Sequence, residues 1–154
     1  MMPPIKPGCR NFNLTLRVPD GETGYVDKFF EGHQAFMRAT HGPSEEPFCL
    51  MYIVTKSPEL KDGNDPSKGT TGNVLYALTE TYQGVEGCDA HMASGRAWGK
   101  SEENGEEEHG PLFGVFLDIV SKYAIASVMA AEVRSDSLTH SIQDIFRSAL
   151  DLLY

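Results

Sequence analysis

The sequence has few cysteines, little basic charge and no long hydrophobic run. Its three cysteines, Cys9, Cys49 and Cys88, form no CxxC pair, and an odd number of separated cysteines favours free thiols over a disulfide framework. Lys and Arg number 13 against 22 Asp and Glu, for a net charge of -9, which argues against nucleic acid as a partner. No segment approaches the roughly 18 consecutive apolar residues of a membrane span, so we expect no membrane association.

The N-terminal residues 1–10 contain three prolines and lack the apolar run of a secretory signal. We therefore expect a cytoplasmic protein. With 154 residues, 40% of them hydrophobic, the chain is long enough for one domain with a substantial core. We predict an N-terminal extension at 1–10 and a single domain at 11–154, whose core covers 11–136.

Four segments have the composition or periodicity of β-strands. Residues 11–18 alternate apolar and polar side chains, which indicates a half-buried strand. Residues 48–56 are nearly continuously apolar and predict a central strand, and residues 73–82 predict a third. The loop between these two contains no helix, so we expect them to pair antiparallel. Residues 125–137 predict the last strand.

The remaining segments with hydrophobic periodicity predict helices. Apolar residues recur at spacings of three and four from Tyr25 to Met37, in a helix that we expect to end at Gly42-Pro43. A short helix is predicted at 83–94, another at 111–124 with a proline at its first position, and an added C-terminal helix at 141–154. Strands and helices in this order indicate an α+β fold, a ferredoxin-like split βαβ with a four-stranded antiparallel sheet and helices on one face.

The segment LYALTETYQGVEGCDAHMAS and this order of elements resemble the dimeric α+β barrel superfamily, in particular its antibiotic-biosynthesis-monooxygenase-like (ABM-like) domains. Members commonly carry an acidic residue two positions before an aromatic one at a strand end, then a short helix, and then a histidine followed by a hydrophobic residue, any residue and Ser. The matching residues are Glu80, Tyr82, His91, Met92 and Ser94.

The resemblance implies a homodimer in which two subunits place their open sheet faces together. An exposed face with apolar side chains also favours such a partner. Each subunit of that superfamily keeps a small-molecule pocket between its sheet and its helices. The long loops predicted at 57–72 and 95–110 and the added C-terminal helix depart from the family pattern, so its substrates are not carried over.

The spacing of the cluster Cys88-Asp89-Ala90-His91 suggests two hypotheses, a metal site and a cysteine nucleophile activated by histidine. One helical turn aims two ligands at most at a common point, and Cys88 and His91 are the pair that share a face. A metal site needs more ligands, so we predict no metal here. Activation of the Cys88 thiol by His91 lacks a third residue, and packing is the commoner role of a cysteine on such a helix.

The chemistry implied by the resemblance is cofactor-independent oxygenation. A substrate hydroxyl would be deprotonated by His91 or His33, and the anion would react with oxygen. His33 lies in the apolar stripe of the first helix, where a hydrogen-bonded core histidine is the alternative. The predicted binding residues are Asn13, Tyr82, Tyr52 and Phe36.

Haem-degrading relatives combine a strand asparagine with a tryptophan and a histidine. Asn13 matches the asparagine, but His91 occupies the position of their tryptophan, and Trp98 follows in the loop. We therefore disfavour haem degradation and predict no cofactor. The expected function is binding of a small, largely apolar molecule, with a monooxygenase acting on a small aromatic or quinol-type substrate as the catalytic version. The alternative is a non-catalytic dimeric ligand-binding or stress-associated protein, and a metalloenzyme is less favoured.

Overall fold

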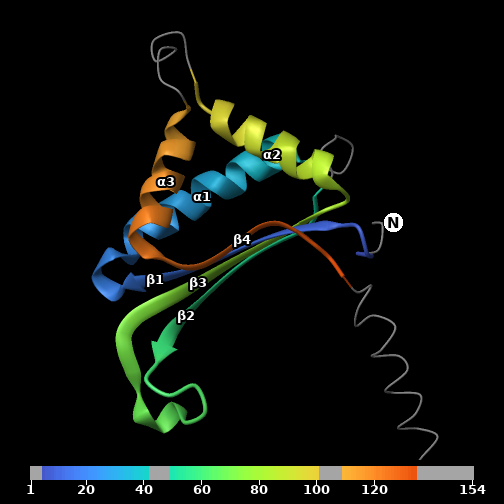
Figure 1. The fold of residues 1–154 in the computed structure, drawn as a ribbon. Helices are drawn as coiled ribbons and strands as arrows, with labels where there is room; N and C mark the ends of the chain where they lie inside the picture. The colour runs from blue at the N-terminus through green and yellow to red at the C-terminus, as the bar shows by residue number, and fades with distance from the viewer. Residues whose placement is uncertain (1–4, 42–48, 101–108, 135–154) are drawn as a thin grey trace, which may run out of the picture.

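The computed structural model describes residues 5–41, 49–100 and 109–134. In that part of the chain four strands form one antiparallel sheet, and three α-helices lie on one of its faces (Figure 1). The predicted α+β class and its ferredoxin-like arrangement are confirmed. The elements are β1 (Arg10–Pro19), η1 (Asp20–Glu22), α1 (Thr23–Thr40), β2 (Cys49–Leu60), η2 (Pro66–Lys68), β3 (Thr70–Tyr82), α2 (Val85–Ala97), α3 (Pro111–Tyr123) and β4 (Ala124–Glu132).

The strands are ordered β2-β3-β1-β4 across the sheet. The antiparallel pairing predicted for the second and third strands is confirmed. The prediction of a central strand at residues 48–56 is wrong, because among the described strands β2 pairs with β3 alone and forms an edge of the sheet. Its apolar character has another cause, since Tyr52 and Val54 pack against the hydrophobic core from that edge.

The hairpin of β2 and β3 is longer than the sequence suggests. The predicted loop at residues 57–72 is wrong at both ends, because β2 continues to Leu60 and β3 begins at Thr70. Polar side chains hold this two-stranded arm together, since the Glu59 carboxylate accepts hydrogen bonds from Thr71, Asn73 and Arg17. Figure 1 shows the arm projecting beyond the helical layer.

The main core lies between the sheet and α1. The alternation predicted for the first strand is confirmed, and each fully buried aliphatic side chain stabilises the fold by about 1.5–3 kcal/mol. The buried side chains of β1 are Phe12, Leu14, Leu16 and Val18, and those of α1 are Val26, Phe29, Phe30, His33, Phe36 and Met37.

The other two helices close the layer over the sheet. α2 continues to Ala97, so the predicted loop at 95–110 begins later than expected, and α3 starts at Pro111 as predicted. None of the described helices is long and apolar enough to cross a membrane. The predicted helix at 141–154 lies outside the described residues, as do Gly42-Pro43 and most of the predicted loop.

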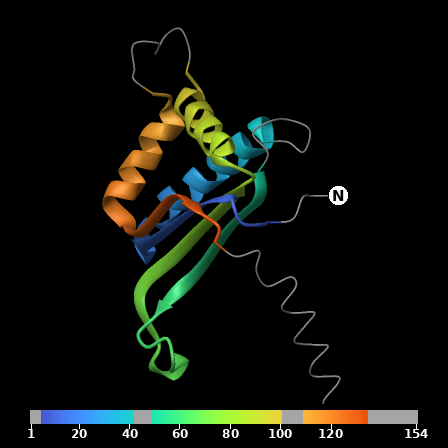
Figure 2. The same ribbon diagram turned by 45° about the vertical axis from the view of Figure 1, so that its right-hand side comes forward.

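The second face of the sheet carries no described helix (Figure 2). The strand register places Ile53, Thr79, Asn13 and Val128 opposite one another in one row across the four strands. Ile53 and Val128 are 47% and 44% exposed. This uncovered face therefore mixes apolar side chains with amide and hydroxyl groups.

Candidate functional site

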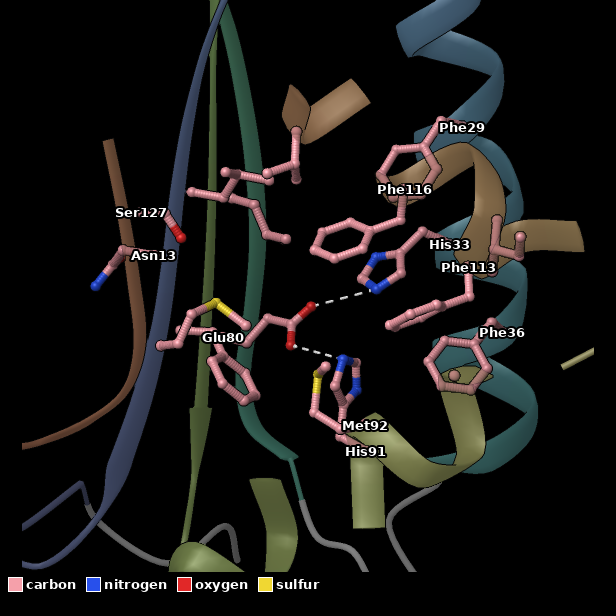
Figure 3. A pocket seen from close by; sticks show the side chains of 17 residues that line it. Asn13, Phe29, His33, Phe36, Glu80, His91, Met92, Phe113, Phe116 and Ser127 are labelled. Carbon is pink, nitrogen blue, oxygen red and sulfur yellow. Dashed lines mark ion pairs between the residues drawn. The ribbon is translucent and has the colours of Figure 1, made fainter. Parts of the chain in front are cut away.

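A cavity of about 220 Å³ lies between the sheet and the helices. An apolar cavity of about 150 Å³ is known to hold one benzene molecule, so this volume suits a molecule of one or two small rings. Aromatic and aliphatic side chains make up most of its wall, and its polar side chains include Glu80, His33 and His91 (Figure 3). The apolar and aromatic residues lining it are Phe12, Leu14, Phe29, Phe36, Leu78, Met92, Leu112, Phe113, Phe116, Val120 and Met129.

Glu80 is the most buried of these polar residues, with 1% of its surface exposed. It follows Leu78 on the inward face of β3, where strand alternation turns every second side chain toward the helices. Its carboxylate lies between two imidazoles, with Oε1 3.5 Å from Nε2 of His33 and Oε2 3.6 Å from Nε2 of His91 (Figure 3). Both separations exceed the usual length of a hydrogen bond.

The two carboxylate oxygens differ in their partners. Oε2 accepts a hydrogen bond of 2.8 Å from the hydroxyl of Tyr82, two residues later on the same strand. Oε1 is buried, and no described residue gives it a hydrogen bond. A buried carboxylate oxygen without a donor is destabilising by about 1–3 kcal/mol or more, so Oε1 is available to a ligand that brings a proton or a positive charge.

His33 and His91 reach the carboxylate from two different helices. His33 stands in the apolar stripe of α1, and its Nδ1 lies 3.1 Å from the Tyr52 hydroxyl on β2. His91 is one turn along α2 from Cys88, and both side chains are buried against the sheet. Each imidazole therefore has an outer partner at Nδ1 and turns Nε2 toward Glu80.

A chain of hydrogen bonds fixes the tautomer of His91. The Thr40 hydroxyl donates its proton to the Phe36 carbonyl at 2.8 Å, so its contact of 2.6 Å with His41 requires an N–H at His41 Nδ1. A neutral His41 then accepts at Nε2, which is 3.2 Å from Nδ1 of His91. Nδ1 of His91 is consequently the donor, and its Nε2 presents a lone pair to Glu80.

Burial shifts the pKa of every group in this cluster toward the neutral form. Desolvation raises the pKa of Glu80 to about 7 and lowers the pKa of His33 and of His41 to about 4. Desolvation, together with the neighbouring imidazoles, lowers the pKa of His91 to about 3. Near pH 7 the imidazoles are neutral, so the contacts with Glu80 are not ion pairs, whereas the carboxyl exchanges its proton readily.

Cys88 does not belong to this cluster chemically. Its buried side chain packs with Phe12 and Tyr82 in a small second core. Desolvation, followed by the charge of Asp89, raises the pKa of the thiol to about 11, and the thiolate is the reactive form of cysteine. The spacing of Cys88 and His91 thus reflects one helical turn that buries both side chains.

The structure gathers five of the six predicted site residues around Glu80. His33, His91 and Phe36 line the cavity, and the hydroxyls of Tyr52 and Tyr82 contact His33 and Glu80 respectively. Asn13 differs. Its backbone borders the cavity from β1, while its side chain bonds to Asn11 and Thr79 and points away from the helices (Figure 3).

Two residues of the cluster were not predicted as functional. Glu80 had a signal in the sequence, because it is a carboxylate on the apolar face of a strand, between Leu78 and Tyr82. An acidic residue is seldom fully buried unless it is paired, so this position predicts a partner for Glu80. His41 had no such signal, since its contact with His91 spans 50 residues and depends on where α1 ends.

The cluster also has the composition of a metal site. Within the described residues, one ligand atom from each of His33, Glu80 and His91 can be chosen so that the three lie within 4.8 Å of one another.

Comparison of the chain with models of protein families, with curated proteins and with solved structures found no match.

Proposed function

We propose that the protein binds a small, largely apolar aromatic molecule in the cavity and acts on a hydroxyl group of that molecule at Glu80. The observation that carries this proposal is Oε1 of Glu80, which has no hydrogen-bond partner among the described residues and lies at the wall of a largely apolar cavity. A phenolic hydroxyl would give this oxygen its missing donor, and the aromatic walls would bury the ring.

The reaction that fits this arrangement is an oxygenation begun by removal of the hydroxyl proton, as in the ABM-like domains that the sequence resembles. The Glu80 carboxylate takes the proton, and the phenolate reacts with dioxygen. With 1-naphthol as substrate, one oxygen atom enters the ring at the para carbon. The second oxygen atom of dioxygen leaves as water, which contains the hydrogen of the hydroxyl group and the hydrogen of the para carbon. The product is 1,4-naphthoquinone.

Binding can be tested with 1-naphthol and naphthalene, which differ by one hydroxyl. Isothermal titration should show saturable binding of both, with 1-naphthol tighter by about tenfold, the equivalent of one added hydrogen bond. Glu80→Gln should reduce this preference, and the exposed Glu86→Gln should retain it. Equal affinity of the wild-type protein for the two compounds would contradict the role of Glu80.

The cavity itself is tested by filling it. Phe116 lines the cavity and contacts Phe29, with 6.2 Å between ring centroids, so Phe116→Trp should abolish binding of both compounds. The neighbouring Leu117 is 44% exposed, and Leu117→Trp is the matched control. Binding that survives Phe116→Trp would place the ligand elsewhere.

Catalysis is tested separately with an oxygen electrode and mass spectrometry of the product. The proposal predicts oxygen consumption with 1-naphthol, loss of turnover in Glu80→Gln and retention in Glu86→Gln. Tight binding of 1-naphthol and of hydroquinone-type compounds without oxygen consumption would instead support the non-catalytic ligand-binding function.

We also propose that the protein is a homodimer joined through the uncovered sheet face. The row of Ile53, Thr79, Asn13 and Val128 crosses all four strands. It offers two exposed apolar side chains at its ends and hydrogen-bonding groups between them, a pattern that a second copy can complement. Light scattering should give twice the mass of the 17.0 kDa chain.

A further inference from the structure

We propose that His33, Glu80 and His91 form a binding site for a divalent first-row transition-metal ion. Two imidazole nitrogens and one carboxylate are the protein ligands of many zinc and non-haem iron sites, which leave further coordination positions open. This inference goes beyond the proposed function, because metal binding here requires no organic ligand in the cavity.

The separations between the ligand atoms fit a metal ion better than direct contact. Metal bonds of about 2.1 Å in tetrahedral geometry place neighbouring ligand atoms about 3.4 Å apart. Nε2 of His33 lies 3.5 Å from Oε1 of Glu80 and Nε2 of His91 lies 3.6 Å from Oε2, both too long for good hydrogen bonds. One ligand atom from each of the three residues can be chosen so that all three lie within 4.8 Å of one another. The side chains of His33 and His91 are each 8% exposed and that of Glu80 is 1% exposed, so packing holds all three in place.

The hydrogen-bond directions supply a second, independent observation. Nε2 of His91 presents a lone pair to Oε2 of Glu80, because its Nδ1 proton is donated to His41. Oε1 of Glu80 accepts no hydrogen bond from the part of the chain that the structure describes. When Glu80 is ionised, Oε2 and Nε2 of His91 are two acceptors that face each other and repel, and a cation between them turns that repulsion into attraction.

The outer partners match those of known metal sites. A histidine that binds metal through Nε2 usually donates its Nδ1 proton to another protein group, which fixes the ring orientation. His91 has His41 in this position and His33 has the Tyr52 hydroxyl at 3.1 Å. The ion would lie at the cavity wall, where its open positions could hold a substrate oxygen.

The test is a titration of chelator-treated protein with Co²⁺, followed by visible absorption, and with Zn²⁺, followed by calorimetry. The proposal predicts one ion per chain and d–d bands without the near-ultraviolet bands of a thiolate ligand. Thiolate bands, or the absence of saturable binding below millimolar metal, would overturn it.

Variants locate the ion. Glu80→Gln and His33→Ala should weaken binding by more than the roughly 10- to 100-fold typical of losing an outer partner, and Tyr52→Phe by an amount within that range. Glu86→Gln and His109→Ala are the matched controls and should bind as the wild type does. Equal affinities in the variants and their controls would overturn the proposal.

One measurement needs no variant, in case the substituted proteins do not fold. Ring ¹⁵N resonances of the wild-type histidines, recorded with and without Zn²⁺, should show changes at Nε2 of His33 and of His91 and none at His109. Unchanged Nε2 resonances at His33 and His91 would overturn the proposal. Because no organic ligand is added, failure here leaves the binding of 1-naphthol untouched, and the reverse also holds.

Discussion

Tyr82 donates a hydrogen bond of 2.8 Å to Oε2 of Glu80 from the same face of β3. The two residues are two positions apart, the period at which strand side chains share a face. The bond gives a fully buried carboxylate its only described donor and lowers the pKa of Glu80 against the larger effect of burial. It holds the carboxylate in position at the wall of the cavity.

Tyr82→Phe should therefore destabilise the protein by about 1–3 kcal/mol at neutral pH, because it leaves Oε2 unpaired. Urea unfolding monitored by circular dichroism measures this change. Tyr25 also donates a hydrogen bond to a carboxylate, that of Asp118. Because Tyr25 is 40% exposed, Tyr25→Phe should lower the free energy of unfolding only slightly. Equal losses in the two variants would contradict the buried role of Tyr82.

Stability should depend on pH through Glu80 in a defined direction. Its pKa of about 7 in the folded protein is above the ordinary value of 4.5, so its contribution to stability is complete below pH 4.5 and is lost as the pH rises to about 7. Glu80→Gln removes this dependence. In metal-free protein the variant should gain up to about 3 kcal/mol relative to wild type across that interval.

The measurement is urea unfolding of both proteins at several pH values. His33, His41 and His91 have lowered pKa values, so their contributions are complete above pH 6.5 and are lost as the pH falls toward 3–4. Because both proteins contain these histidines, the histidine contributions largely cancel in the difference between the two free energies of unfolding. For the exposed Glu86→Gln, the difference in free energy of unfolding from wild type should not change with pH. A pH-independent difference for Glu80→Gln would contradict the buried state of Glu80.

Gly95 and Gly110 should respond in opposite ways to substitution by alanine. A Cβ at Gly95 in α2 would lie 3.7 Å from the Phe36 ring, an ordinary contact, so Gly95→Ala should stabilise the helix by up to about 1 kcal/mol. A Cβ at Gly110 would lie 2.1 Å from the Trp98 carbonyl oxygen, and Gly110→Ala should destabilise by about 1–3 kcal/mol. Thermal unfolding of both variants checks the pair, and a stable Gly110→Ala would contradict the close packing of this turn.

The proposed dimer makes its own prediction. Ile53→Lys places a charge on the uncovered sheet face and should convert the dimer to a monomer in light scattering at micromolar concentration. Leu117→Lys changes an equally exposed apolar residue on the helical layer and should leave the dimer intact. A wild-type monomer would contradict the proposed interface.

Sequence periodicity predicts the fold well here, because strand alternation and helical stripes are local properties. It places β1, α1 and α3 correctly, and it identifies the inward face of β3 that carries Glu80. It fails for the position of β2, since an apolar strand looks the same at an edge as at the centre when its side chains reach the core. It also fails for the β2–β3 arm, which hydrogen bonds to Glu59 stabilise.

The site was only partly predictable for a related reason. His33 stands out as a histidine in the apolar stripe of a helix, and His91 belongs to the segment that resembles ABM-like domains. Their meeting at Glu80 depends on how α1 and α2 cross the sheet, which the spacing of residues does not encode. The position of the Asn13 side chain follows from alternation, because its neighbours Phe12 and Leu14 face the core.

The most direct test of the central claim is a crystal structure of the protein with 1-naphthol. The proposed function predicts the rings inside the cavity, against Phe36 and Phe116, with the hydroxyl oxygen within hydrogen-bonding distance of Oε1 of Glu80. Rings bound outside the cavity, or a hydroxyl turned away from Glu80, would contradict it.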